Sequence, residues 1–300
     1  MPTPGHGAVA FGLRWASDVP LSAFAQAPVT PDADVTIRRV AALAPRDPVV
    51  TIANATLCTD GIRFVLDDGV TIDIYPPGRI DWIAGPDWSG SFQPQFFGTL
   101  TALLLAWRGS VPIHGTSIEI DGKAWLICGQ SGAGKSTLGA ALVASGAARL
   151  IADDLSVLET GNDAVLSLHA GRPGMRLFPV IARLMERAGA GIARSEPGND
   201  KLIVEPPHVA ALQSVPLAAT ILLDEGDTKL PWQRAKLLRA HRFRPRWMDA
   251  IPGSEGRDRT IRLAATRLPM LFMPSAEIHD AAAFTERANA VLERISSLRS

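Results

Sequence analysis

The sequence has little of several features that define common protein classes. It contains only two cysteines, Cys58 and Cys128, among 300 residues, which is too few for a disulfide framework. Its strongest apolar run, residues 100–107, falls far short of the roughly 18 residues needed to cross a bilayer. The N-terminus has neither the basic start nor the apolar core of a signal peptide. We therefore expect a cytoplasmic protein that does not insert into a membrane.

The chain also has no formal net charge. Thirty basic residues balance thirty acidic ones, whereas a nucleic-acid-binding protein needs a basic excess to neutralise phosphates. We therefore expect no nucleic-acid partner. Apolar residues make up 47% of the chain and charged residues 20%, so the chain has enough material for a large core and no composition typical of disorder.

The first third of the chain shows two kinds of pattern. Residues 1–48 give weak signals, and we expect a helix there followed by a loosely ordered segment. Residues 49–82 consist of short β-branched runs separated by Asp-Asp-Gly and Pro-Pro-Gly turns, which predicts an antiparallel meander. Residues 92–108 predict a helix that ends at Gly109. We therefore expect a small β-rich domain over residues 1–108 and an α/β domain over residues 109–300.

The second region alternates strand and helix patterns. Residues 111–120 and 123–129 read as strands joined by an Asp-Gly turn. A glycine-rich turn, an alanine-rich helix over 136–145 and a strand over 149–152 follow. Further on, we expect an apolar strand at 218–223 and an amphipathic helix at 281–298. This order is typical of an α/β fold.

The glycine-rich turn carries the strongest motif. The phosphate-loop pattern G-x-x-x-x-G-K-[ST] is matched in full by Gly129, Gln130, Ser131, Gly132, Ala133, Gly134, Lys135 and Ser136. Glycines let consecutive backbone N–H groups point at phosphate oxygens, and the N-terminus of the following helix adds a partial positive charge. Lys135 would contact the outer phosphates and the Ser136 hydroxyl would ligate Mg²⁺. A strand leads into the loop and a helix leads out, which is the context that the motif requires.

Two adjacent acids, Asp153 and Asp154, end the strand that follows the phosphate-loop helix. Ligands collect at strand ends of α/β sheets, and we expect this strand to lie beside the phosphate loop. Asp153 could hold Mg²⁺ while the other carboxylate acts as a base toward an acceptor hydroxyl. The alternative is a turn in which an aspartate caps the next segment. His114, considered alone, would be a structural histidine.

Residues 113–158 resemble the HPr kinase/phosphorylase family, whose kinase domain shares its fold with phosphoenolpyruvate carboxykinase. The resemblance is carried by His114-Gly115, the phosphate loop at 129–136, Ser145-Gly146 and Ala152-Asp153-Asp154. It implies an α/β fold with this phosphate-loop core, here preceded by a small β-rich domain. It also implies ATP and Mg²⁺ as cofactors.

The resemblance further implies roles for the matching residues. Asp154 matches the carboxylate that accepts the proton of a serine hydroxyl, and His114 matches the active-site histidine. The implied catalytic set is Asp154, His114, Lys135 and Asp153. Thr137 stands where the family usually has an acidic residue, and the family's Glu-Ile-Arg-Gly segment is absent from the sequence. Both departures argue against the family's reverse, phosphorylase activity and against HPr as the substrate.

The layout of the whole chain is most similar to the stand-alone kinases of lasso-peptide and related peptide-modification pathways. This similarity implies an ATP-dependent serine kinase acting on a peptide or small protein, in the lasso case at the C-terminal serine of a precursor peptide. The alternatives are an HPr-type kinase, a kinase of free serine or another small metabolite, and an ATP-binding sensor or assembly protein. A homo-oligomer is an open option.

Basic residues follow this core. Arg172 and Arg176 flank a Pro-Gly turn and could clamp nucleotide phosphates or a carboxylate of the acceptor. We count both, together with Thr137, among the predicted nucleotide-binding residues; Lys201 could act similarly. The densest basic run, residues 234–246, is expected to form an exposed helical face followed by a proline turn, and an acidic peptide segment is the partner it could otherwise receive.

Overall fold

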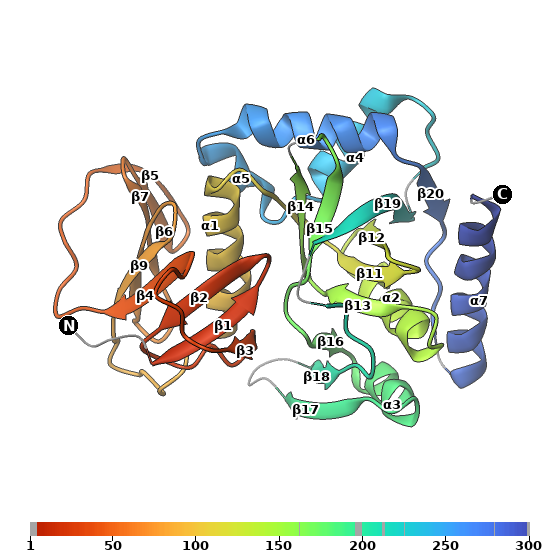
Figure 1. The fold of residues 1–300 in the computed structure, drawn as a ribbon, viewed down its shortest axis with the longest axis horizontal. Coiled ribbons are helices and arrows are strands. Elements are labelled where there is room, and N and C mark those ends of the chain that lie inside the picture. Colours follow the sequence, from red (N-terminus) through yellow and green to blue (C-terminus); the bar gives the residue numbers. More distant parts are fainter. Residues whose placement is uncertain are drawn as a thin grey trace.

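The structure is a computed structural model that describes residues 5–161, 163–195, 200–211, 214–224, 226–278 and 280–298. Figure 1 shows two bodies of β-sheet with a helix, α1 (Thr101–Trp107), between them. Over these described ranges the chain is a mixed α/β protein with three sheets. Within the described ranges, no helix combines the length and the apolar character that a membrane span requires.

The first sheet contains nine strands from the first 83 residues. They are β1 (His6–Ala10), β2 (Leu13–Ser17), β3 (Ala25–Ala27), β4 (Val35–Arg39), β5 (Pro48–Ile52), β6 (Ala55–Cys58), β7 (Gly61–Val65), β8 (Thr71–Tyr75) and β9 (Arg79–Ile83), in the order β3-β1-β2-β4-β9-β8-β7-β6-β5. Strands β5 to β9 pair antiparallel in sequence order, so the predicted meander is confirmed.

The expectation of a helix within residues 1–48 is wrong for the described residues. These residues form β1 to β4 and begin β5. Strand β4 pairs in parallel with both β2 and β9, and its Val35 and Ile37 side chains are completely buried. Parallel neighbours come from segments distant in sequence, so the short pattern of β4 could not reveal the pairing that stabilises it.

The predicted helix at 92–108 is present as a π-helical turn, η1 (Phe96–Leu100), followed by α1. Every residue from Ala102 to Ala106 is at most 1% exposed. The surrounding core cluster includes side chains of the first sheet together with Leu155 and Phe243 from the second half. A helix buried on all sides is expected to lie between layers, and α1 does so.

The second sheet has eight strands. They are β10 (Val111–His114), β11 (Thr116–Ile120), β12 (Lys123–Gly129), β13 (Arg149–Ala152), β14 (Leu155–Thr160), β15 (Leu166–His169), β19 (Ser214–Leu223) and β20 (Met270–Met273). Their order is β10-β14-β15-β19-β12-β11-β13, with β20 also paired to β19. Only β12–β19 and β19–β20 pair in parallel among these strands.

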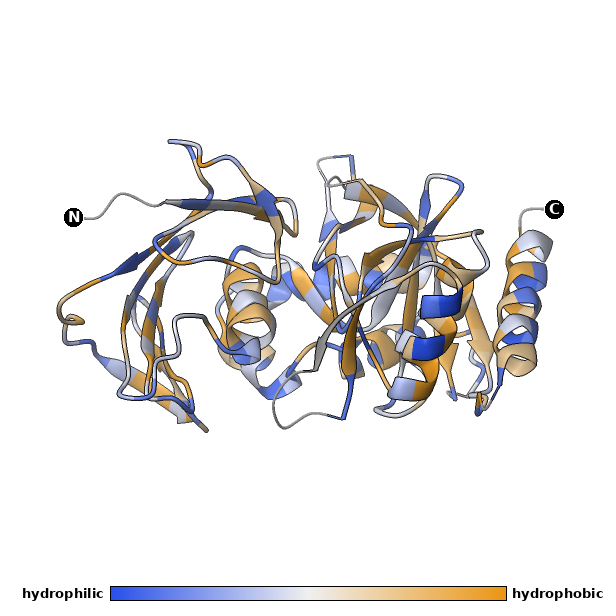
Figure 2. Cartoon of the chain, turned by 90° about the horizontal axis from the view of Figure 1, so that it is seen from below, coloured by the Kyte–Doolittle hydropathy of each residue, from blue (hydrophilic) through white to orange (hydrophobic). Residues whose placement is uncertain are grey.

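Helices cover both faces of the second sheet. One core cluster joins the sheet to α2 (Lys135–Ala144), α3 (Pro179–Arg187) and α7 (Ala281–Ser297). Another joins the opposite face to α4 (Pro231–Ala240) and α6 (Ser254–Arg267). Figure 2 shows the central strands of this sheet as predominantly apolar, as expected for strands buried on both faces.

The remaining elements complete the second half. A three-stranded sheet contains β16 (Met175–Leu177), β17 (Gly191–Ser195) and β18 (Leu202–Glu205) in the order β16-β18-β17. A short helix, α5 (Pro245–Ala250), links α4 to α6. The division into domains 1–108 and 109–300 stays a prediction, and the core around α1 takes side chains from both ranges.

Candidate active site

The phosphate loop connects β12 to α2, as its sequence context requires. Gly132 and Gly134 have φ values of 87° and 89°, a left-handed conformation that glycine adopts without steric cost. Gly134 immediately precedes α2, and no side chain caps the N-terminus of this helix. The first N–H groups of α2 are therefore available to an anionic ligand.

Lys135 is held against its own loop. The side chain is 7% exposed, and its Nζ donates to the main-chain oxygens of Gly129 at 3.0 Å and Gln130 at 2.9 Å. Burial lowers the pKa of Lys135, and this effect is opposed by Cys128 and the two aspartates. The ammonium group is thus already placed at the loop where phosphates would bind.

Asp153 is fixed by donors from two other elements. It is 3% exposed, its Oδ1 accepts from Thr116 Oγ1 at 2.7 Å and its Oδ2 accepts from the Arg176 backbone N–H at 3.0 Å. Strand β13, which leads to it, is separated from β12 by β11. The two aspartates still reach the phosphate loop, because β13 ends at the same edge of the sheet.

Asp154 has a different environment. Its side chain is 31% exposed and its Oδ1 lies 3.2 Å from His114 Nδ1, while Arg176 Nη1 lies 4.0 Å from Oδ2. The same His114 nitrogen lies 3.2 Å from the Asp154 main-chain oxygen; because both partners are acceptors, Nδ1 carries the proton. Burial alone would raise the pKa of Asp154, but His114, Arg176 and Arg172 outweigh it and hold the pKa below its ordinary value.

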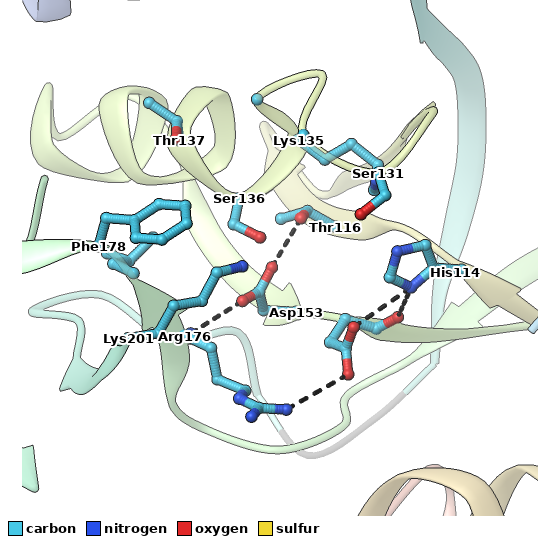
Figure 3. A pocket seen from close by; sticks show the side chains of 14 residues that line it. His114, Thr116, Ser131, Lys135, Ser136, Thr137, Asp153, Arg176, Phe178 and Lys201 are labelled. Carbon is cyan, nitrogen blue, oxygen red and sulfur yellow. Dashed lines mark hydrogen bonds and ion pairs between the residues drawn. The ribbon is translucent and has the colours of Figure 1, made fainter. Parts of the chain in front are cut away.

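These groups share one cavity of about 330 Å³, shown in Figure 3. Its lining consists of His114, Thr116, Ser131, Gly132, Gly134, Lys135, Ser136, Thr137, Asp153, Asp154, Arg176, Leu177, Phe178 and Lys201. Most of the predicted site residues are therefore brought together. The cavity is within the usual size range of ligand sites.

Four predicted nucleotide-binding residues lie outside this lining. Gly129 and Gln130 line a neighbouring cavity. Ala133 is buried in the core that joins α2 to the sheet. Arg172 is 9% exposed and reaches the site through its charge, which acts on the pKa of Asp154. We do not assign Ala133 or Arg172 a direct contact with a ligand in this cavity.

Sequence reasoning missed three residues of the lining, Thr116, Leu177 and Phe178. Thr116 positions Asp153, and Phe178 lies under Lys201, whose Nζ is 5.1 Å from the ring centroid. Thr116 follows His114-Gly115 by one residue, so strand alternation places it on the same face as His114. The sequence therefore contained the information needed to place Thr116 at the site. No local sequence pattern indicated that Phe178, one residue after β16, would lie there.

The oxygen atoms that line the cavity can be compared with the ligands that Mg²⁺ prefers. No cluster of three or more His, Cys, Asp or Glu side chains suited to a metal occurs in the part of the chain that the structure describes. Mg²⁺ in phosphotransfer sites is held by one or two protein oxygens together with substrate phosphates and water. The Ser136 hydroxyl and the Asp153 carboxylate, both lining the cavity, fit that mode.

Comparison with known proteins adds little. No protein-family model matches the chain, and no curated protein matches its sequence. Among solved structures, the HPr(Ser) kinase/phosphatase from Coxiella burnetii aligns with 62% of this chain and 92% of its own, at 16% identity and a TM-score of 0.34. A TM-score of this size supports no conclusion about fold or function, so the site must be interpreted from its own geometry.

Proposed function

We propose that this chain is an ATP- and Mg²⁺-dependent kinase with an HPr-kinase-like phosphate-loop core. One observation carries the proposal: the glycine-rich loop, the uncapped N-terminus of α2, Lys135 and both aspartates surround a single cavity. Backbone amides and a lysine bind phosphate, and acids opposite them suit an incoming hydroxyl.

The nucleotide would bind through its phosphates. The amides of residues 130–136 and the helix N-terminus would hold the β- and γ-phosphates, and Lys135 would exchange its two carbonyl partners for phosphate oxygens. Ser136 and Asp153 would hold Mg²⁺, which supplies charge neutralisation to the phosphate oxygens when bound. Thr116 and the Arg176 amide keep Asp153 oriented for this task.

Asp154 would act as the base. The acceptor oxygen forms a bond to the γ-phosphorus, the bond from that phosphorus to the β,γ-bridging oxygen breaks, and ADP leaves. The acceptor's hydroxyl proton goes to Asp154, whose lowered pKa keeps it ionised at neutral pH. His114 donates to Asp154 and is a positioning residue in this scheme.

The acceptor is proposed to be a serine of a peptide or small protein, and the resemblance favours a lasso-type precursor peptide in the cytoplasm. The opening of the site supports a peptide over a small metabolite, because Asp154 also lines two larger open hollows of about 470 and 650 Å³. A free-serine kinase would need a closed pocket around the same carboxylate.

The test is phosphate transfer. Purified protein is incubated with Mg-ATP and serine-containing peptides, including the short peptides encoded near its gene, and phosphoserine is detected by mass spectrometry. Asp154→Asn is the matched variant, since asparagine has the same shape and tolerates the φ of 69° at this position. It should bind nucleotide but lose about 100-fold or more in transfer, whereas Lys135→Ala should lose both.

Two results would contradict the proposal. Equal transfer by Asp154→Asn and the parent would remove the base from the scheme. Nucleotide binding without hydrolysis or transfer would favour the sensor or assembly role instead.

A further inference from the structure

Asp154 and Arg176 line three cavities at once. Besides the phosphate-loop cavity, they border a hollow of about 470 Å³ and another of about 650 Å³. The larger hollow is lined by residues from both halves of the chain, including Ser91, Gln93 and Gln95 ahead of η1. We call the two hollows together the inter-half groove. It runs from the candidate base to the first half of the molecule.

Residues 240–245 line the smaller hollow of this groove and belong to the basic run 234–246 of the sequence. The predicted helical face is present in α4, whose residues apart from Leu238 are exposed or half-exposed, but His241 and Arg242, which follow it, are buried. The His114 N–H donates to the His241 carbonyl at 2.8 Å, and the Phe243 N–H donates to the Pro112 carbonyl at 2.9 Å. The segment is therefore attached to β10, the strand that carries His114.

This attachment presents Arg244 to the groove. Arg244 has φ 50° and ψ 65°, a left-handed conformation that is unfavourable for a non-glycine residue and that clusters at functional sites. It lines both hollows of the inter-half groove. Among the described residues, its exposed side chain has no hydrogen bond or ion pair, whereas nearby Arg242 pairs with Asp249 at 2.8 Å.

The rest of the larger hollow's lining combines polar side chains with Phe92, Pro94, Gly98 and Phe243. Asp67 is the other carboxylate of the larger hollow besides Asp154, and it accepts from Gln95 Nε2 at 3.0 Å. Asp154 Oδ1 lies 3.2 Å from His114 Nδ1, and its Oδ2 lies 4.0 Å from Arg176 Nη1. Serine, glutamine and threonine side chains in the lining suit the main chain of an extended peptide. Arg176 lies 4.0 Å from Asp154 and Arg242 pairs with Asp249, so Arg244 is the arginine of the described lining that has no ion pair.

We propose that the inter-half groove is the acceptor subsite and that Arg244 binds a carboxylate of the acceptor peptide while its hydroxyl faces Asp154. The inference rests on the proposed function, because it assigns the site of the second substrate. A guanidinium suits this task since its planar fork matches a carboxylate in two hydrogen bonds. The carboxylate could be an acidic side chain or the peptide's C-terminus.

Three synthetic peptides distinguish these sources. Each has eight residues and one serine: one has glutamates beside the serine and blocked ends, one has glutamines in those positions and blocked ends, and one has glutamines with a terminal serine and a free C-terminal carboxylate. Transfer from Mg-ATP is measured as kcat/KM. We expect the parent protein to prefer one carboxylate peptide over the neutral one by about tenfold or more.

Arg244→Asn and Arg246→Asn are the paired variants. Asparagine tolerates the left-handed backbone, and both changes remove one positive charge. Arg246 is exposed in α5 and lines neither hollow. Arg244→Asn should abolish the preference for a carboxylate, chiefly through KM, and Arg246→Asn should keep it.

The outcomes separate the two proposals. Equal rates on all three peptides, ATP hydrolysis without transfer to either carboxylate peptide, or an unchanged preference in Arg244→Asn would overturn the acceptor subsite. Absence of both ATP hydrolysis and transfer in the parent protein would overturn the kinase assignment itself.

Discussion

At the scale of single residues, Asp154 shows how neighbours can outweigh burial. Burial favours the protonated acid, yet His114 and the arginines 172 and 176 hold its pKa below the ordinary value of 3.8. A carboxylate with a lowered pKa stays ionised to lower pH. We therefore expect protonation of Asp154 to lower the transfer rate only below about pH 4. We call this fall in rate at low pH the acid limb.

His114→Ala should move that acid limb to higher pH. It removes the hydrogen bond and the charge that lower the pKa of Asp154 most, so burial is opposed by the arginines alone and the pKa rises. His114→Asn is the control, because the asparagine amide can donate from nearly the same place as Nδ1. Transfer rates between about pH 4 and 8 check this; superimposable profiles for parent and His114→Ala would contradict it.

Residues of the site differ in how far the sequence could predict them. The phosphate loop and the Asp153-Asp154 pair have contiguous motifs, so their approach to one another could be expected. Arg244 lies ninety residues after Asp154, and only the pairing of residues 241–243 with β10 brings it to the site. Such a contact depends on tertiary structure, which no local pattern encodes.

At the scale of elements, α2 and β11 are packed so closely that the contact also positions the site. A Cβ added at Gly139 of α2 would lie 2.5 Å from Thr116 Cγ2, and Thr116 holds Asp153 through its hydroxyl. Glycine costs a helix roughly 1 kcal/mol relative to alanine, so a helix propensity argument alone would favour alanine here. The close approach explains why glycine is needed.

Gly139→Ala should therefore lower both stability, by about 1–3 kcal/mol, and transfer activity. The double variant Gly139→Ala with Thr116→Ser should recover much of both losses, because serine lacks Cγ2 and keeps the hydroxyl that donates to Asp153. Urea unfolding and transfer rates of the single and double variants provide the measurement. Equal activity in the single variant and the parent would show that Thr116 does not position Asp153.

Elements with local turn signals were predicted well, and so were the apolar strands β13 and β19, whereas the strands β1 to β4 were not. The meander β5–β9 and the β11–β12 hairpin have their turn residues in sequence, including Asp121 and Gly122 at φ 51° and 71°. The predicted strand at 111–120 is divided, because residues before Gly115 pair with β14 and residues after it pair with β12 and β13. A Cβ at Gly115 would lie 2.7 Å from the Ile127 carbonyl oxygen, so this glycine permits the change of partner.

At the scale of the whole molecule, one buried arginine joins the two halves. Arg257 of α6 is 1% exposed. Its Nη1 donates to the carbonyl oxygens of Ala106 at 2.8 Å and Pro252 at 2.7 Å, and its Nη2 donates to those of Met248 at 2.8 Å and Ile251 at 2.7 Å. Ala106 belongs to α1, so the guanidinium links this central helix to the end of α5 and the loop after it.

Arg257→Met should destabilise the protein by about 3 kcal/mol or more. Methionine fills part of the volume but removes the donor from four carbonyl oxygens, of which only that of Ala106 keeps a partner among the described residues, the Gly109 N–H. Each buried acceptor left unsatisfied costs about 1–3 kcal/mol before relaxation. Arg257→Lys should recover little, since an ammonium cannot reproduce the planar fork. Arg259→Met, at an exposed position two residues further along α6, should change stability by less than about 0.5 kcal/mol. Urea unfolding followed by tryptophan fluorescence measures these differences.

The guanidinium of Arg257 attaches α1 to the second half of the molecule, and α1 packs against the first sheet. We therefore expect the unfolding transition of Arg257→Met to broaden or divide, because the two halves no longer unfold cooperatively. Equal midpoints for the two methionine variants would show that the halves are held together by the shared apolar core around α1 alone.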